Sequence, residues 1–285
     1  AQTGHYANRK NPLITLVDAQ ATQQVSELVM LVPALEQLLD INTHNLSIDS
    51  LSTGQLQDVL GSPPNVIYIC AESDIHAFTL AQRLASLPGL EGTTIVAGLL
   101  QTDTLTELLF EENQARHNNV KLFPLISKTS NLKQIIGEQQ DEAAKIIHNI
   151  YCEDQLKQGG TVESNTSLTP WEKLPEGIKD SNRGQADHLL IKLRAIGLTL
   201  DEAVTTAEPL VFTPEQIDTL ADMEHRRWAA GKRLDGWRPT SGKRDNKQKL
   251  SPLLVDFNDL PEEEKHKDKV VVDSLRLIAN LKARR

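Results

Sequence analysis

The residues best suited to bind a ligand lie in one basic stretch of the sequence. From His225 to Lys249 there are nine Lys and Arg residues and two Asp residues, a local charge of +7 in a chain whose net charge is −9. Two of the three tryptophans, Trp228 and Trp237, lie in this stretch. Because an indole ring can stack on a purine and Lys and Arg bind phosphate, the stretch predicts a site for a small nucleotide-like anion. A solvated helix face with a charged loop fits the charge pattern equally well.

The predicted contacts to this ligand combine an aromatic ring with charged and polar side chains. Trp237 follows Gly236, which is expected to end a helix, and we expect the Trp237 ring to stack on the ligand. Trp228 is a second candidate, although it shares a helix face with His225 and fits the packed core better. Each charged candidate, taken alone, also fits a solvated surface position. The charged and polar candidates are Lys232, Arg238, Arg244, Asn182 and Asp268.

The other polar residues form no pattern that is typical of catalysis or metal binding. The histidines show no metal-ligand spacing, and Asp187-His188 has no nucleophile motif near it. His148 and His225 are interpreted as partly buried side chains that bond to backbone. The sequence therefore predicts a non-catalytic binding protein that requires no cofactor and no metal. A nucleotide-processing enzyme is the least favoured alternative.

An internal repeat in the C-terminal half indicates how the candidate residues are positioned. A His, an aromatic residue three positions later and a Gly eight positions further on occur at 148–159 and again at 225–236. An aromatic residue followed by Leu-Pro-Glu and then Lys occurs at 171–179 and again at 257–265. We predict two similar helical units, a degenerate copy at 148–196 and a full copy at 225–280, around an approximate twofold axis. The cleft between them is the predicted ligand site.

The N-terminal part alternates apolar runs with helical stretches, which is typical of a parallel sheet covered by helices. Pro33 is expected to kink or split the first helical stretch. The chain is therefore predicted to be α/β, with an incomplete Rossmann-like parallel sheet over 1–130 and mainly α-helical tandem repeats over 131–285. The predicted strands are 13–17, 45–48, 66–70, 93–97 and 120–123, and the predicted helices are 21–39, 51–60, 73–87 and 102–110.

A cofactor site in this first part lacks its main motif. A Rossmann sheet that binds NAD carries G-x-G-x-x-G after its first strand and an acidic residue after its second. The sequence contains no G-x-G-x-x-G, and Asp18 stands where the ribose-binding acid would be. A strand-end Asp that caps the next helix is the favoured interpretation of Asp18. We expect NAD to bind weakly or not at all, because the backbone donors for its pyrophosphate are lacking.

Bulk properties narrow the class of protein further. A chain of 285 residues can hold two domains, and no apolar run is long enough to span a bilayer. Only two cysteines, Cys70 and Cys152, are present, which fits a reducing compartment and predicts a cytoplasmic location. An acidic chain is a poor general binder of nucleic acid. A homo-oligomer is compatible with all of these properties.

The second copy resembles the RyR domain, a repeat of ryanodine receptors. The residues that carry the resemblance are Met223–Trp228, Lys232, Gly236-Trp237, Arg244-Asp245, Lys247, Pro252–Val255, Leu260–Lys265 and Asp268. The family usually has Tyr-Gly soon after Gly-Trp and His before the Pro, where this chain has Pro239 and Ser251. In ryanodine receptors, paired repeats of this kind are associated with adenine-nucleotide binding. The resemblance therefore implies an adenine nucleotide or a related nucleotide as the ligand.

The whole chain resembles a bacterial protein type in which a TrkA-N-like NAD-binding domain precedes RyR repeats. This second resemblance is carried by Trp171–His188 and Lys192–Gly197. It implies ligand sensing and regulation rather than catalysis. It also motivates an alternative, in which the chain is the cytoplasmic gating subunit of an ion channel or transporter whose membrane part is absent from this chain.

Overall fold

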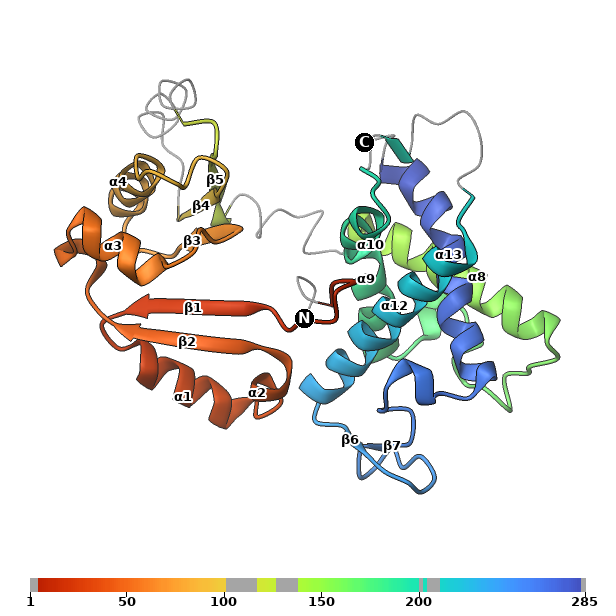
Figure 1. The fold of residues 1–285 in the computed structure, drawn as a ribbon. Coiled ribbons are helices and arrows are strands. Elements are labelled where there is room, and N and C mark those ends of the chain that lie inside the picture. The colour runs from red at the N-terminus through yellow and green to blue at the C-terminus, as the bar shows by residue number, and fades with distance from the viewer. Residues whose placement is uncertain (1–4, 101–116, 127–137, 200–201, 204–210, 283–285) are drawn as a thin grey trace. The chain divides into compact units, whose positions relative to one another are not determined.

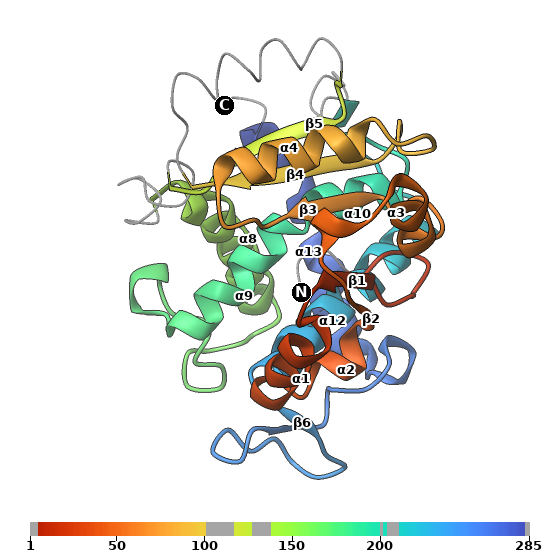
Figure 2. The ribbon, with the colours of Figure 1, turned by 90° about the vertical axis from the view of Figure 1, so that its left-hand side faces the viewer.

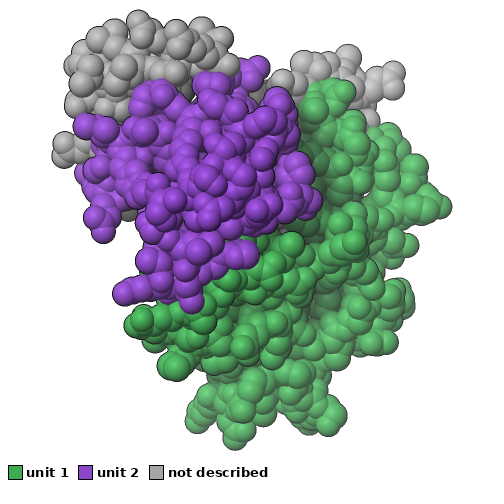
Figure 3. Space-filling model, turned by 60° about the vertical axis from the view of Figure 1, so that its left-hand side comes forward, with its two compact units in different colours: residues 1–16, 22–43, 140–285 green, residues 17–21, 44–139 purple. Residues whose placement is uncertain are grey.

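The computed structural model describes residues 5–100, 117–126, 138–199, 202–203 and 211–282. The fold is of the α/β class with short parallel sheets, as the sequence predicted. The chain divides into two compact units, one of residues 1–16, 22–43 and 140–285 and the other of residues 17–21 and 44–139 (Figure 3). The predicted boundary between 130 and 131, like the predicted helix at 102–110, lies outside the described residues.

The unit that contains residues 44–139 is built on a three-stranded parallel sheet. Its strands β3 (Val66–Ile69), β4 (Thr94–Leu99) and β5 (Val120–Pro124) lie in the order β3-β4-β5. Helix α4 (Asp74–Ala85) packs across one face of this sheet (Figure 2). Between them lies the core, with α3 (Thr53–Leu60) at its border; it includes Leu56, Ile69, Ala81, Leu84, Ile95, Ala97 and Leu99. Ile95, Ala97 and Leu99 of β4 are buried, whereas Val66 and Tyr68 of β3 are exposed.

Helices α3 and α4 each begin after a serine that satisfies a free amide of the first turn. The Ser52 hydroxyl accepts from the Gln55 amide, and the Gln55 side chain accepts from the Ser52 amide, which forms a capping box. The Ser73 hydroxyl accepts from the His76 amide at the start of α4. These caps explain why the two helices begin where the sequence predicted.

Residues 13–45 form a separate two-stranded sheet with two helices. Strands β1 (Leu13–Asp18) and β2 (Asp40–Asn45) run in the same direction (Figure 1). Between them the chain forms α1 (Ala21–Leu31) and α2 (Leu35–Leu38), so Pro33 splits the predicted helix. The predicted strand at 45–48 is wrong: pairing with β1 places the strand earlier, and Ile48–Ser50 is a 3₁₀ turn, η1.

The C-terminal part is mainly helical, and both copies of the repeat contain a long helix, then a 3₁₀ turn, then a further helix, while the second copy also has two short strands before its turn. The first copy contains α8 (Glu138–Lys157), the 3₁₀ turn η2 (Trp171–Lys173), α9 (Glu176–Asp187) and α10 (Leu189–Ala195). The second contains α12 (Pro214–Leu234), the short strands β6 (Arg238–Pro239) and β7 (Leu250–Ser251), the turn η3 (Phe257–Asp259) and α13 (Glu262–Lys282). A shared core joins them through Ile147, Leu189, Leu193, Leu220, Met223, Val272 and Leu275.

Matching contacts hold the first helix of each copy to the segment that follows it. His148 Nε2 lies 2.8 Å from the Thr169 carbonyl oxygen, and His225 Nε2 lies 2.9 Å from that of Val255. Both His side chains thus bond to backbone, as interpreted from the sequence. Gly159 and Gly236 both have φ of 83°, the left-handed conformation predicted for the residue that ends each helix. The twofold relation between the copies stays a prediction.

Candidate ligand-binding surface

The structure brings three of the predicted ligand residues together at the end of α12. Trp237 is half-buried and directly follows Gly236, whose left-handed backbone turns the chain out of the helix. Lys232 Nζ lies 5.2 Å from the centroid of the Trp237 ring, and Arg244 Cζ lies 4.8 Å from it. Both distances are within the range of cation–π attraction. An ammonium and a guanidinium therefore both contact the one indole ring.

Positive charge is concentrated near the Trp237 ring. We call the four residues Lys232, Trp237, Arg244 and Lys249 the Trp237 cluster. Burial lowers the pKa of the Lys232 ammonium, and the neighbouring cations Arg244, Arg227 and Lys249 lower it further. Asp235 opposes this effect. Lys249 Nζ donates to the backbone oxygen of Asp235, 2.6 Å away. Because like charges at close range repel, an anion bound at this cluster would gain from every one of these cations.

The loop that carries Arg244 is fixed by backbone bonds. The Arg238 amide donates to the Lys249 carbonyl at 2.8 Å, and the Thr240 amide donates to that of Ser251 at 3.2 Å. Pro239 lies between these two donors. Proline has no backbone N–H, and the β6–β7 pair requires none at this position. Pro239 and Ser251, the departures from the usual family pattern, are thus both accommodated in the β6–β7 pair. The Arg238 side chain is exposed beside it.

The other predicted ligand residues have partners elsewhere. Trp228 stacks on His225 with ring centroids 5.7 Å apart. This contact is of the packing kind that the sequence favoured for Trp228. Asp268 Oδ2 lies 3.5 Å from His225 Nδ1, and Asn182 Nδ2 donates to the Ile178 carbonyl one turn earlier in α9. Among the described residues, Asn182 and Asp268 make no hydrogen bond or ion pair with each other or with the Trp237 cluster.

Asp18 lies at the end of β1 and shapes the turn into α1. Its Oδ1 accepts from the Gln20 amide at 2.7 Å. This local bond is of the kind that Asp side chains make in turns before helices. Because α1 begins at Ala21, this bond is local to the turn, and both the helix cap and the ribose contact considered for Asp18 stay predictions.

A buried charge cluster escaped the sequence analysis. Lys192 of α10 and Glu224 of α12 are each 1% exposed, and Lys192 Nζ lies 2.7 Å from Glu224 Oε2. Arg227 Nη2 lies 2.6 Å from Glu224 Oε1. Burial would raise the pKa of the Glu224 carboxyl, but the two cations together hold it well below its usual value. Glu224 lies one helical turn after Leu220, and this spacing could have placed it on the inner face.

The segment before β1 docks on the middle of α12. Arg9 Nη2 lies 2.6 Å from Asp222 Oδ1, and Arg226 Nη2 donates to the Tyr6 carbonyl at 2.8 Å. His5 is partly buried, and burial together with nearby Arg226 lowers its pKa to about 4. No periodic pattern in this short polar segment could have predicted the contact.

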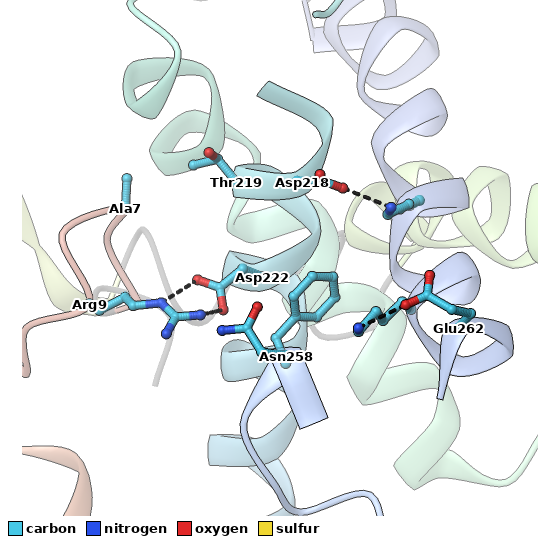
Figure 4. A pocket seen from close by; sticks show the side chains of 10 residues that line it. Ala7, Arg9, Asp218, Thr219, Asp222, Asn258 and Glu262 are labelled. Atoms are coloured by element: carbon cyan, nitrogen blue, oxygen red, sulfur yellow. Dashed lines mark hydrogen bonds and ion pairs between the residues drawn. The ribbon is translucent and has the colours of Figure 1, made fainter. Parts of the chain in front are cut away.

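Two cavities stand out in the described part of the chain. One, of about 470 Å³, is open and lies on the second copy beside the docked segment (Figure 4). The residues that line it include Arg9, Asp218, Asp222, Phe257, Glu262 and Lys269, and none of the predicted ligand residues. The other, of about 130 Å³, lies in the unit of residues 44–139, between the end of α3 and the turn at Gly89.

Together these features define an α/β protein with a helical, two-copy C-terminal part that carries a basic, aromatic surface. In a comparison with protein-family models, residues 213–284 of the chain match the RyR domain. The match covers the second copy, including the Trp237 cluster, and leaves 148–196 outside it. No curated protein matches the chain. No helix among the described residues is long and apolar enough to cross a membrane.

Proposed function

We propose that the RyR domain binds a small nucleotide-like anion at the Trp237 cluster and that the chain is a non-catalytic ligand sensor. The observation that supports this most directly is the pair of cations, Lys232 and Arg244, held over one indole ring. A protein surface normally disperses like charges or pairs them with acids. Here Asp235 is the acid that opposes the cations Arg244, Arg227 and Lys249 around Lys232. A bound anionic group would balance the remaining positive charge.

Binding would use the cluster in two ways. A phosphate group would accept hydrogen bonds from Lys232, Lys249 and the forked guanidinium of Arg244. The ligand's base would stack on Trp237 in exchange for Arg244, whose guanidinium lies over the ring in the free protein. Arg244 can make this exchange because it is exposed, and among the described residues its side chain hydrogen-bonds to Asn246 alone, through Nε at 2.9 Å.

Calorimetric titration with a panel of adenine and guanine nucleotides tests the proposal. Trp237→Ala should weaken the binding of the responding nucleotide by about tenfold or more, because a stacked base contributes ~1–3 kcal/mol. Arg244→Gln should weaken it and reduce its dependence on salt, since one charge contact is lost. Lys243→Gln is the matched control, because Lys243 is the exposed neighbour in the same loop and does not contact the ring.

Two results would contradict the proposal. One is that no nucleotide binds. The other is that Lys243→Gln and Arg244→Gln weaken binding equally, which would leave only a diffuse basic surface suited to an acidic protein partner. Circular dichroism of each variant checks that a loss of affinity is not a loss of fold.

The alternative of a channel or transporter gating subunit uses the same sensor. The docked segment that precedes β1 favours a regulatory chain of this kind, because it ties the ligand-binding helix α12 to the N-terminal α/β elements through Arg9 and Asp222. Co-purification of the ligand-responsive chain with a membrane protein would support the gating alternative over a free sensor.

A further inference from the structure

The first copy of the repeat holds a guanidinium group in a site of its own. Arg183 of α9 places its Nε 2.6 Å from Asp141 Oδ1 and its Nη1 2.5 Å from Glu176 Oε1. Its Cζ lies 5.9 Å from the centroid of the Trp171 ring, and Asp180 adds a further carboxylate at 2.7 Å. Four side chains thus surround one planar cation from the edges and from the face.

The second copy repeats the walls of this site but not the group that fills it. Aligning the two His-aromatic motifs and the two Leu-Pro-Glu motifs gives the equivalent residues. Asp141, Trp171, Glu176 and Arg183 correspond to Asp218, Phe257, Glu262 and Lys269. Among the described residues the shorter Lys269 side chain pairs with Asp218 alone, with Nζ 2.7 Å from Oδ1. Glu262 pairs instead with Lys265, whose Nζ lies 5.9 Å from the Phe257 centroid.

In the second copy, these wall residues line the open cavity of about 470 Å³. Figure 4 shows Asp218 and Glu262 among the side chains that line it. We infer that this cavity binds a guanidinium group supplied from outside the chain, either by a small guanidine compound or by an arginine side chain of a protein partner. The first copy is the template for the inference, because there the same wall residues contact the group directly.

The chemistry of the walls favours guanidinium over a simple ammonium. A planar, delocalised cation can lie on the Phe257 ring and at the same time direct N–H groups to Asp218 and Glu262. Arg9 shows that an acid of this cavity takes a guanidinium fork, since its Nε and Nη2 lie 3.2 and 2.6 Å from the two oxygens of Asp222. The cations and acids of the lining balance each other, so we expect affinity of about a millimolar.

Two probes added to the 285-residue chain test the inference and separate the two sources. Agmatine represents a small guanidine, and the capped peptide Gly-Arg-Gly represents a partner's arginine. The same peptide with citrulline and the diamine cadaverine are the controls. At about 10 mM, which saturates a millimolar site, at least one guanidinium probe should shift the backbone amide signals of Phe257, Asn258 and Asp218, and both controls should shift them far less.

The relative strength of the two probes identifies the source. Equal affinities mean that the guanidinium alone is recognised, as for a small compound, whereas a clearly tighter peptide means a protein partner. Absence of shifts with both probes, or equal shifts with cadaverine, would overturn the inference. The nucleotide affinity of the Trp237 cluster is measured separately, so failure of one site leaves the other standing.

Variants based on the first copy sharpen the test. Lys269→Arg should fill the site from within, abolish probe binding and leave nucleotide binding unchanged. Glu262→Gln should weaken probe binding by about fivefold as a carboxylate contact is lost, while Glu263→Gln, an exposed neighbour outside the cavity, should not. Arg183→Lys should open a second site in the first copy. Probe binding that survives Lys269→Arg unchanged would place the probe elsewhere and overturn the inference.

Discussion

At the scale of single residues, Glu224 is the anion that allows Lys192 and Arg227 to be charged inside the protein. Both oxygens of its carboxylate are engaged, at 2.7 Å with Lys192 and 2.6 Å with Arg227. Glu224→Gln keeps the shape but leaves two buried cations without a counter-charge. Breaking a buried ion pair in this way costs about 3–5 kcal/mol. Urea unfolding should show a loss of this size, while Glu263→Gln on the exposed start of α13 should change stability by less than about 0.5 kcal/mol.

The same carboxylate makes stability depend on acid. Because the folded-state pKa of Glu224 lies below its unfolded value, its contribution is complete above the unfolded pKa and is lost as pH falls through the folded pKa. Stability of the unaltered chain should therefore fall below about pH 4.5 more steeply than that of the Gln variant. Equal slopes for the two proteins would show that Glu224 is not the group responsible.

His5 predicts a milder acid response in the docked N-terminal segment. Its folded-state pKa, about 4 because of burial and Arg226, lies below the ordinary value of 6.5. The unfolded or undocked segment therefore takes up a proton first, and docking is weakened as pH falls from 6.5 towards 4. NMR titration should follow the His5 ring signals to a midpoint near pH 4. A midpoint near 6.5 would mean that the segment is not docked in solution.

The sequence singled out three residues of the Trp237 cluster, Lys232, Trp237 and Arg244, but not Lys249, the buried ion cluster or the docked segment. Trp237 and its cations were found because composition and local motif are visible within one stretch of chain. Lys192 and Glu224 lie 32 residues apart, and a Lys in an amphipathic helix ordinarily indicates a solvated face. Their burial is set by how α10 packs on α12, which is tertiary information that no single segment contains.

At the scale of helices, Gly184 sets how closely α9 approaches α12. A Cβ at this position would lie 2.9 Å from Arg227 Nη1, whose guanidinium is anchored on Glu224 and cannot easily move. Gly184→Ala should therefore destabilise the chain by about 1–3 kcal/mol through overpacking, despite the better helix propensity of Ala. Gly177→Ala in the same helix meets nothing within 4 Å and should stabilise by up to about 1 kcal/mol. Thermal unfolding of the two variants measures the difference; equal and small effects would show that α9 can shift.

The elements that the sequence predicted best are those with strong local signals. The strands around Val66–Ile69 and Thr94–Leu99 were found from continuous apolar runs, and α3 and α4 from their capping serines. Strand β2 was misplaced because Asp40–Asn45 is polar and becomes a strand only by pairing with β1. Weak or absent NAD binding stays a prediction, because the sequence contains no G-x-G-x-x-G.

At the scale of the molecule, the long helix α12 connects three features that lie far apart in the sequence. Its last turn carries Lys232 of the Trp237 cluster, its inner face carries Glu224, and a different face carries the buried Asp222, which pairs with Arg9. Arg9 lies just before β1, which begins at Leu13. A ligand that changes the position or mobility of α12 can therefore be reported to the N-terminal strand through one helix and one ion pair, without a longer chain of contacts.

Hydrogen exchange on the whole chain, with and without the nucleotide that binds best, tests this connection. We expect the nucleotide to slow exchange at the end of α12 and also in residues 13–16 of β1, since a ligand that orders α12 stabilises what is docked on it. Arg9→Ala should abolish the effect on β1 and keep the effect on α12. Lys10→Ala is the matched control, because Lys10 is the exposed neighbouring cation and its side chain makes no hydrogen bond or ion pair within the described residues. If β1 still responds in the Arg9 variant, the signal does not pass through the docked segment. If β1 does not respond in the unaltered chain, the RyR domain binds its ligand without informing the N-terminal part.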